Sequence, residues 1–352
     1  MKKIGIITIN DNCNYGNRLQ NYAVCEIFKK MGMDGITIKN NVNSNMQIFK
    51  EKIKYIAKMF FFKKKYDRVK NFKMFNKNIK FSDYCIRKDS IPCNINEKYD
   101  YFVVGSDQVW NPEFGRLSDI DLLTFATNNK KVALSASFGV SELSKENQKK
   151  VRDELSKFKA ISVREEAGRN IAKKATNRDD IEVLIDPTMM INSSDWDKVL
   201  KKPRMLKNDR FILNYFLGEL SDERKNEIYR FAQENNCEVI NILDKNSKFY
   251  ACGPSEFLYL EKNAFLICTD SFHSSVFAIL YKRPLLIFER ENKGWTSMNS
   301  RLETLTQKFG LDKQCFKGRI SDESIECNYN EVDEILENER KKFEAYINKA
   351  VN

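Results

Sequence analysis

The chain has 352 residues and a hydrophobic content of 42%, enough to build two cores of ordinary size, so a disordered protein is excluded. No apolar run in the sequence approaches the ~18 residues of a membrane-spanning helix. The net charge is +11, and almost all of it comes from residues 50–80, which hold twelve basic and two acidic residues.

The first half of the chain alternates strand-like and helix-like patterns. Its start, Met1–Lys3 and then Ile4–Ile9, resembles a signal peptide superficially, but the apolar stretch is too short and polar residues follow at once. We therefore predict a first strand there and a cytoplasmic protein. Strands are expected at residues 4–9, 36–38, 101–105, 131–137, 160–163 and 181–185. Helices are expected at residues 17–31, at 144–158 and from 165 to about 175.

A basic segment at about residues 45–98 interrupts this alternation and is predicted to be a helical insertion in the first domain. Three interpretations stay open for residues 50–80. They form a solvated insertion whose aromatic side chains pack on the domain, they contact an anionic membrane surface at its inner face, or they bind RNA or an acidic glycan. No nucleic-acid motif accompanies the charge, so a nucleic-acid partner is not expected. The Phe60-Phe61-Phe62 stretch is either core or membrane anchor.

A second alternating series begins after residues 188–208. Its strands are expected at residues 211–217, 238–243, 264–268 and 285–288, and its helices at 222–235, 253–263, 272–281, 298–309 and 331–351. Strands that alternate with helices predict an α/β fold with parallel sheets covered on both faces. We expect two Rossmann-like domains facing each other across a cleft, at residues 1–190 and 205–330, and then a C-terminal helix at 331–352.

The stretch at residues 263–289 contains His273, the only histidine. Thr269, Asp270 and Ser271 lie where a strand is expected to end and a helix to begin. In open parallel sheets ligands bind at such strand ends, and a helix N-terminus favours anions. Two interpretations stay open: His273 binds a ligand there, with Asp270 as its partner, or His273 packs in the core and Asp270 caps the helix.

Metal and dinucleotide chemistry are not expected from the motifs. The nine cysteines are scattered, and the sequence has no C-x-x-C pair and one histidine, so neither a zinc site nor a disulfide framework is predicted. The sequence also lacks G-x-G-x-x-G and the P-loop pattern.

Seven short motifs occur in order along the chain. They are N-Y-G-N-R-L-Q-N-Y-A at 14–23, V-G-S-D-Q-V-W at 104–110, A-S-F-G at 136–139, S-V-R-E at 162–165, D-P-T at 186–188, G-P-S-E-F at 253–257 and T-D-S-F-H at 269–273, with K-R-P following at 282–284. Together they resemble the signature of the polysaccharide pyruvyl transferase family over roughly residues 4–310.

The resemblance implies a fold like that of the two-domain glycosyltransferases called GT-B. It also implies transfer of a pyruvyl group from phosphoenolpyruvate to a sugar of a cell-surface glycan precursor, usually as a cyclic ketal, with release of phosphate. The expected partner is a glycan or a lipid-linked sugar, and no metal or cofactor is expected besides phosphoenolpyruvate as co-substrate.

Candidate site residues follow from this chemistry and from the strand ends. His273 is predicted to contact the donor phosphate or to act as the acid, and Asp107 to orient or deprotonate the acceptor hydroxyl. The donor-binding candidates are Arg164, His273, Ser271, Ser274 and Arg301. The acceptor-binding candidates are Asn17, Gln20 and Asp107. The structural alternatives are a turn cap for Asp107, a surface ion pair with Glu165 or Glu166 for Arg164, and helix capping for Asn17 and Gln20.

One position departs from the family pattern, which has an arginine two residues before the histidine. That position is Ser271 here, so the guanidinium has to come from Arg283 or Arg301, or the donor differs. The alternative functions are a GT-B-type glycosyltransferase that uses a nucleotide sugar, and a non-catalytic basic scaffold in glycan assembly.

Overall fold

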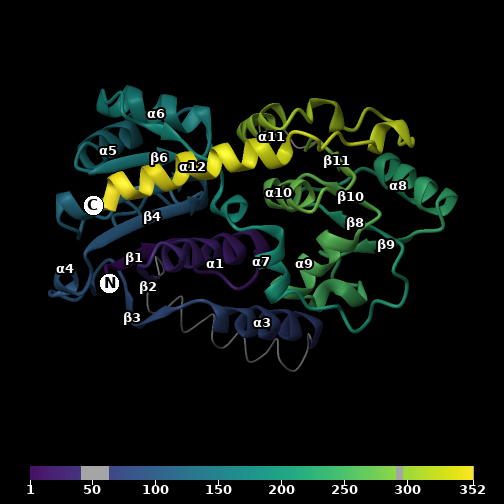
Figure 1. Cartoon of the computed structure of the whole chain (residues 1–352), viewed down its shortest axis with the longest axis horizontal. Helices are drawn as coiled ribbons and strands as arrows, with labels where there is room; N and C mark the ends of the chain where they lie inside the picture. The colour runs from purple at the N-terminus through teal and green to yellow at the C-terminus, as the bar shows by residue number, and fades with distance from the viewer. Residues whose placement is uncertain (41–62, 291–295, 352) are drawn as a thin grey trace. The chain divides into compact units, whose positions relative to one another are not determined.

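The computed structural model describes residues 1–40, 63–290 and 296–351, which form two compact α/β units (Figure 1). Unit 1 contains residues 1–40, 76–191 and 336–351 of the described chain, and unit 2 contains residues 63–75, 192–290 and 296–335. The predicted α/β class with two Rossmann-like units is confirmed.

The described part of unit 1 holds one parallel sheet of seven strands in the order β3-β2-β1-β4-β5-β6-β7. The strands are β1 Lys3–Ile7, β2 Asp34–Asn40, β3 Phe81–Ile86, β4 Tyr101–Asp107, β5 Lys131–Ala136, β6 Ala160–Val163 and β7 Glu182–Val183. The central strands β4 and β5 are buried at nearly every position, because helices cover both faces of a parallel sheet. Their sequences are therefore continuous apolar runs and do not alternate.

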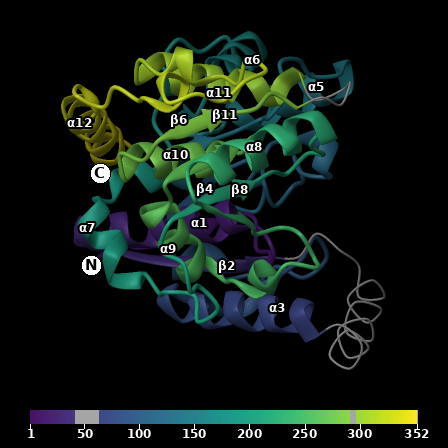
Figure 2. The same cartoon turned by 90° about the vertical axis from the view of Figure 1, so that its right-hand side faces the viewer.

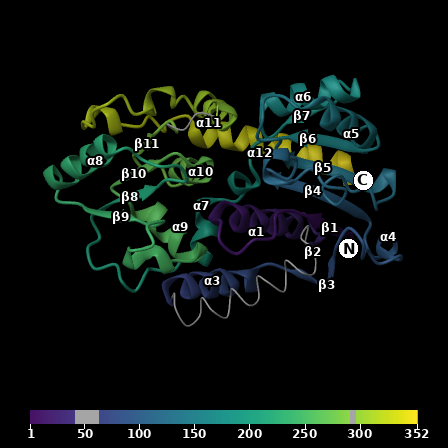
Figure 3. The same cartoon turned by 180° about the vertical axis from the view of Figure 1, so that it is seen from behind.

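The longer helices of unit 1 follow the strands in chain order. They are α1 Tyr15–Lys30, α5 Lys145–Leu155, α6 Glu166–Thr176 and, from residue 336 on, α12 Val332–Val351, with the short α4 Ile95–Lys98. In α1 the side chain of Asn14 accepts a hydrogen bond from the backbone N–H of Asn17, which caps the helix start. Helices α5 and α6 pack against each other (Figure 3).

Three side chains of the C-terminal helix α12 donate hydrogen bonds to backbone carbonyls of unit 1. Tyr346 donates to the carbonyl of Ala133 at 2.6 Å, Lys342 to that of Val183 at 2.8 Å, and Arg340 to that of Met189 at 2.9 Å. These bonds satisfy carbonyls on β5 and β7 and in the segment after β7.

Unit 2 holds a parallel sheet of four strands in its described residues, in the order β11-β10-β8-β9. Its strands are β8 Phe211–Tyr215, β9 Glu238–Asn241, β10 Leu266–Thr269 and β11 Leu285–Ile287. Its helices are α3 Lys63–Phe75, α7 Ser193–Trp196, α8 Asp222–Glu234, α9 Pro254–Asn263, α10 Phe272–Leu280 and α11 Thr296–Lys308.

The basic segment divides between the two units. Helix α3 belongs to unit 2 and lies near α9 (Figure 2). It packs mainly against the 3₁₀ turn Lys248–Ala251 that precedes α9, where Arg68 and Asn71 donate to the carbonyls of Tyr250 and Ala251 at 3.1 and 2.7 Å. The sequence analysis placed these residues in an insertion of the first domain. It also missed β3, an edge strand of unit 1 within residues 45–98. Phe60-Phe61-Phe62 lies outside the described residues.

Candidate functional site

The sheet of unit 1 has a topological switch point between β1 and β4. From β1 the chain adds β2 and β3 on one side of the sheet and β4 to β7 on the other. In open α/β sheets ligands bind in the crevice outside the carboxyl ends of such strands. The motif at residues 14–23 begins α1 after β1, and the motif at 104–110 contains the carboxyl end of β4.

Gln20 of α1 bridges the two strands of the switch point. Its Nε2 donates to Oγ1 of Thr8, just after β1, at 2.7 Å, and its Oε1 accepts from the backbone N–H of Ser106 in β4 at 3.1 Å. Gln20 is fully buried. Both ends of its amide are therefore used within the protein, and they fix the position of β4 relative to α1. Its predicted contact with an acceptor sugar stays a prediction.

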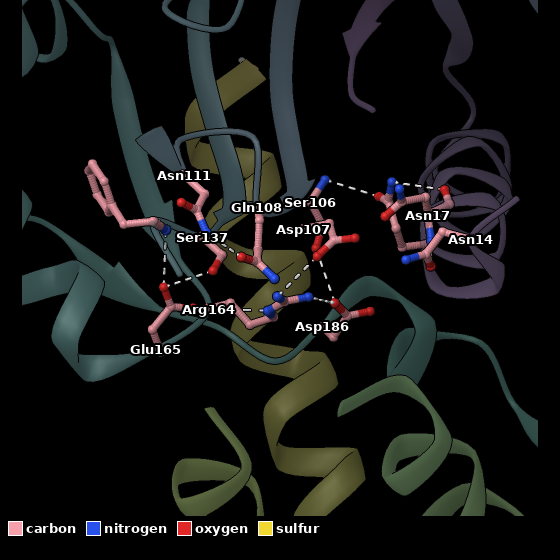
Figure 4. A network of polar contacts seen from close by, with 12 residues as sticks. Asn14, Asn17, Ser106, Asp107, Gln108, Asn111, Ser137, Arg164, Glu165 and Asp186 are labelled. Carbon is pink, nitrogen blue, oxygen red and sulfur yellow. Dashed lines mark hydrogen bonds and ion pairs between the residues drawn. The ribbon is translucent and has the colours of Figure 1, made fainter. Parts of the chain in front are cut away.

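Asp107 is the last residue of β4 and has left-handed backbone geometry, with φ of 64°. Asp tolerates this region better than most residues, and such outliers cluster at functional sites. Its Oδ1 accepts from Nη2 of Arg164 at 3.3 Å (Figure 4). The Asp107 side chain is 8% exposed, whereas those of Asp186 and Glu165 are 0% and 2% exposed. Of these three carboxylates, Asp107 is the one most accessible to a substrate.

Arg164 lies at the centre of a buried cluster of carboxylates. It follows β6, and its Nη1 bonds Oδ2 of Asp186 at 2.8 Å, while Glu165 lies 4.0 Å from its Nε. Burial lowers the pKa of Arg164, but the three surrounding carboxylates outweigh burial, so the pKa is raised and the guanidinium stays charged. Three carboxylates face one cation, so the cluster favours hydroxyl donors over a phosphate.

The two other carboxylates are fixed by local bonds. Asp186 caps the turn that follows it, accepting from the N–H and Oγ1 of Thr188 at 3.0 and 2.7 Å, and it also accepts from Oγ of Ser106 at 3.1 Å. Glu165 accepts from Oγ of Ser137 at 2.9 Å and from the N–H of Phe138 at 3.1 Å. The motifs at 104–110, 136–139, 162–165 and 186–188 thus meet in one network (Figure 4).

Asn17 lies on the first turn of α1 and is bound to Asp11. Its Nδ2 donates to Oδ2 of Asp11, and the backbone N–H groups of Cys13 and Asn14 donate to Oδ1 of the same carboxylate. Asp11 therefore orders the loop between β1 and α1. The predicted acceptor role of Asn17 also stays a prediction.

Unit 2 has its own switch point in its described sheet, between β8 and β10. Strand β9 lies on one side of β8, and strands β10 and β11 lie on the other side. Asp270, which follows β10, links the end of β10 to the loop after β8. Its carboxylate accepts from the backbone N–H groups of Leu217 and Gly218, both at 2.7 Å, and from Nε of Arg290 at 2.8 Å. These bonds show Asp270 as an anchor between loops, and Ser271 occupies the N-cap position of α10.

The predicted donor-site residues of unit 2 surround the start of α10. His273 is 7% exposed and its ring packs edge-on against Phe272 at 5.4 Å. Arg301 is buried, with its guanidinium carbon 6.0 Å from the Phe272 ring. Ser274 points elsewhere: its Oγ donates to Oε1 of Glu261 at 2.6 Å. Unit 2 therefore places His273 and Arg301 on the ring of Phe272, next to the N-cap residue Ser271, and uses Ser274 inside the unit.

Two charged residues near α10 were missed by the sequence analysis. Arg290 follows β11, and only the folded topology shows that it meets Asp270. Glu261 of α9 is fully buried, and burial raises its pKa well above the ordinary value. A glutamate within the apolar stripe of α9 was a sequence signal for a buried acid. Arg283, a predicted source of the missing guanidinium, donates its Nε to the carbonyl of Lys262.

Comparison with known proteins gives the family of the chain. The family model described as "Polysaccharide pyruvyl transferase" matches residues 14–292, which includes the switch-point motifs of both units. The chain belongs to the polysaccharide pyruvyl transferase family. Family membership makes the protein a transferase. No curated protein sequence matches the chain significantly.

Solved structures resemble this family member at the level of fold. A putative UDP-N-acetylglucosamine 2-epimerase from Listeria monocytogenes has a TM-score of 0.52 at 11% identity, over 100% of this chain and 90% of that one. UDP-GlcNAc 2-epimerases from Methanocaldococcus jannaschii and Rickettsia bellii have TM-scores of 0.48 and 0.47 at 14% and 15% identity. These matches cover 96% and 100% of this chain and 92% and 97% of theirs. The Listeria match supports the GT-B-like fold alone.

No helix in residues 1–40, 63–290 or 296–351 is long and apolar enough to cross a membrane. Over the same ranges, His, Cys, Asp and Glu side chains do not gather in threes as metal ligands would. The prediction that no metal or cofactor takes part stays a prediction.

Proposed function

We propose that the protein transfers a pyruvyl group from phosphoenolpyruvate to two hydroxyls of one sugar in a cell-surface glycan precursor. The product is a cyclic ketal and inorganic phosphate. The observation that carries the proposal is the site at the β8/β10 switch point of unit 2, where His273 opens α10 and Arg290 is held by Asp270. A helix N-terminus next to guanidinium groups suits a donor with a phosphate and a carboxylate.

The reaction begins with proton transfer to the methylene carbon of the donor, which becomes a methyl group. The adjacent carbon is left cationic, and one sugar hydroxyl oxygen adds to it and gives its proton to a base. The bond to the phosphate oxygen then breaks, and phosphate leaves. The second hydroxyl adds to the cationic carbon that remains. In the net reaction, one of the two hydroxyl protons replaces the proton that the acid gave to the methyl group. The other leaves on phosphate.

Unit 2 takes the donor in this proposal. His273 contacts the donor phosphate or supplies the proton, and Arg290 and Arg301 provide the positive charge that Ser271 lacks. Arg290 is a good ligand because Asp270 orients its guanidinium at 2.8 Å, so little freedom is lost on binding.

Unit 1 takes the sugar acceptor. Asp107 is the base because it is the most exposed carboxylate of the Arg164 cluster. Arg164 acts through Asp107 and Asp186, which it holds in place, and is a positioning residue in this scheme. Asn17 contributes a hydrogen bond to the acceptor when Asp11 releases its amide.

The test measures phosphate release and product mass when the protein meets phosphoenolpyruvate and a panel of lipid-linked and nucleotide-linked sugars. We expect phosphate and a pyruvyl ketal of one acceptor, and His273→Ala and Asp107→Asn should each slow turnover ~10²–10⁴-fold. Arg290→Gln should raise the KM for phosphoenolpyruvate about tenfold, as expected for loss of one charged hydrogen bond. The control is Arg210→Gln, which changes an exposed arginine of the same unit and should leave this KM unchanged.

Other outcomes favour the alternative functions. Glycosyl transfer from a nucleotide sugar, without phosphate from phosphoenolpyruvate, would identify a glycosyltransferase. Glycan assembly that survives His273→Ala but not neutralisation of the basic segment would identify a scaffold.

Helix α3 is proposed to contact an anionic membrane surface. Arg68, Phe72 and Phe75 are buried, while Lys63, Lys65 and other lysines of the helix are exposed. Each exposed lysine contributes about 1 kcal/mol near an anionic leaflet. Co-sedimentation with vesicles containing phosphatidylserine should fall sharply when Lys63, Lys65 and Lys70 become Gln. It should not fall when the exposed unit 1 lysines Lys145, Lys149 and Lys174 do.

A further inference from the structure

A hollow of about 370 Å³ lies in unit 2 at the carboxyl ends of β8 and β9. Its volume falls within the ~300–1,000 Å³ range of ligand sites. The hollow is on the β9 side of β8, whereas Asp270 and His273 belong to the β10 side. The two sites share one loop: Phe216 lines the hollow, and the next two residues, Leu217 and Gly218, bond Asp270. The hollow is therefore adjacent to the switch point and distinct from it.

The floor of the hollow is a short chain of hydrogen-bonded side chains. Asn214 of β8 and Asn241 of β9 are register partners, and Nδ2 of Asn214 donates to Oδ1 of Asn241 at 2.9 Å. Nδ2 of Asn241 donates in turn to the hydroxyl of Tyr229 on α8 at 3.0 Å. The orientation of each amide follows from this chain.

The polar group that reaches the hollow is the half-buried amide of Asn241. Asn214 also lines the hollow, but its Oδ1 is covered and accepts no hydrogen bond from the described part of the chain. Beyond its bonds to Asn214 and Tyr229, the Asn241 amide keeps a second N–H and a second lone pair on its oxygen. A ligand with hydroxyl groups, which both donate and accept hydrogen bonds, therefore suits the floor.

The walls of the hollow are aromatic and apolar. Tyr229 is 50% exposed although it is a large aromatic residue, and Phe216, Leu220 and Leu243 complete the lining. The charges at the rim largely cancel: Lys225 is paired with Asp222 at 2.9 Å, and Asp244 is the one carboxylate among the described lining residues. An anion or a metal ion is not favoured by this set.

We propose that the hollow binds a hexopyranose ring of a glycan, with an apolar face of the ring stacked on Tyr229 and a hydroxyl bonded to the amide of Asn241. A sugar ring has both features that suit the site: apolar C–H faces for the aromatic walls and several hydroxyls for the amide. At this site the protein would bind a sugar residue of the glycan other than the one that reacts. This binding does not depend on the identity of the donor.

The test is saturation-transfer NMR and titration of the full-length protein with D-glucose, D-galactose, D-mannose and N-acetyl-D-glucosamine, with uridine and inorganic phosphate as comparison ligands. At least one hexose should bind in the millimolar range. Tyr229→Ala should weaken it about tenfold by removing the stacking wall. Leu220→Trp, which fills the hollow, should abolish binding.

Phe114→Ala serves as the matched control, because Phe114 is a 47% exposed aromatic residue of unit 1. It should leave hexose binding unchanged. The proposal is overturned when no hexose binds, when Tyr229→Ala and Leu220→Trp bind as wild type does, or when uridine binds at this hollow and the hexoses do not. These readouts measure binding, so they are independent of pyruvyl transfer.

Discussion

Arg164 is a buried cation whose charge is balanced within unit 1 by Asp107 and Asp186. Its side chain is 1% exposed, so removing it leaves two carboxylates buried beside each other without a counter-charge. The balance of charge around Arg164 therefore affects both the stability of unit 1 and the geometry of Asp107.

Arg164→Ala should therefore lower the free energy of unfolding by about 3–5 kcal/mol, the usual cost of breaking a buried ion pair on one side. Arg169 offers a matched control, because its pair with Glu166 is 45% and 51% exposed. Arg169→Ala should cost less than about 1 kcal/mol. Urea unfolding followed by circular dichroism measures both. Equal costs would mean that the Arg164 cluster does not stabilise unit 1.

Glu261 gives a prediction with a defined pH dependence. Burial raises its pKa well above the ordinary value of about 4.5, and the hydrogen bond from Ser274 acts in the opposite direction. The folded protein thus holds this proton more tightly than the unfolded chain. The contribution of Glu261 to the free energy of unfolding is complete below about pH 4.5 and is lost as pH rises toward the raised pKa of the folded protein.

Glu261→Gln keeps an acceptor for Ser274 and removes the titration. The stability difference between variant and wild type should be constant below about pH 4.5 and should then grow in favour of the variant. Its slope should be at most about 1.4 kcal/mol per pH unit. Unfolding at a series of pH values measures it. A difference that stays flat up to pH 8 would contradict a buried neutral acid at this position.

At the scale of elements, the close approach of β4 and β5 depends on Gly105. A Cβ atom there would lie 2.1 Å from the carbonyl oxygen of Leu134, and the backbone φ is 129°. Gly115 also has a positive φ, 64°, but a Cβ atom there meets nothing within 4 Å.

Gly105→Ala should therefore cost about 3 kcal/mol or more, because β4 must move away from β5. Gly115→Ala should cost only about 1–2 kcal/mol, the strain of a left-handed residue. Denaturant unfolding separates the two. Activity should also fall in Gly105→Ala, because β4 carries Asp107. Similar costs for the two variants would show that the contact between the strands is not tight.

The sequence predicts most elements because their patterns are local. Helix α10 and strand β6 are found at nearly the predicted positions, since an apolar run bounded by polar residues determines each. Strand β3 was missed because, at the edge of the sheet, only part of it is buried and its pattern is weak. The sequence predicts helix α3 as an insertion in the first domain, because no local residue pattern shows that this helix packs near α9 in unit 2.

The candidate site was predictable in part for the same reason. Strand ends placed Asp107, Arg164 and His273 near switch points. The partners of these residues come from distant segments: Asp186 for Arg164, and Arg290 for Asp270. A single sequence does not show such pairs, so the roles of Arg164 as a counter-ion and Asp270 as a loop anchor emerged only from the structure.

At the scale of the whole molecule, the described sheet of each unit has one switch point, and the family match at residues 14–292 includes both. Unit 1 presents carboxylates around one guanidinium, and unit 2 presents a helix start with His273, Arg290 and Arg301. This difference in chemical character suits the proposed roles, in which unit 2 takes an anionic donor and unit 1 a neutral sugar. We propose above all that the site of unit 2 holds phosphoenolpyruvate.

The measurement that tests this claim most directly is thermal unfolding of the full-length protein with phosphoenolpyruvate and, separately, with nucleotide sugars. A ligand at a hundred times its dissociation constant adds about 2.7 kcal/mol to the stability of the state that binds it. We predict that phosphoenolpyruvate raises the Tm of wild type and of Asp107→Asn but not of His273→Ala. A rise in Tm with a nucleotide sugar and none with phosphoenolpyruvate would contradict the account.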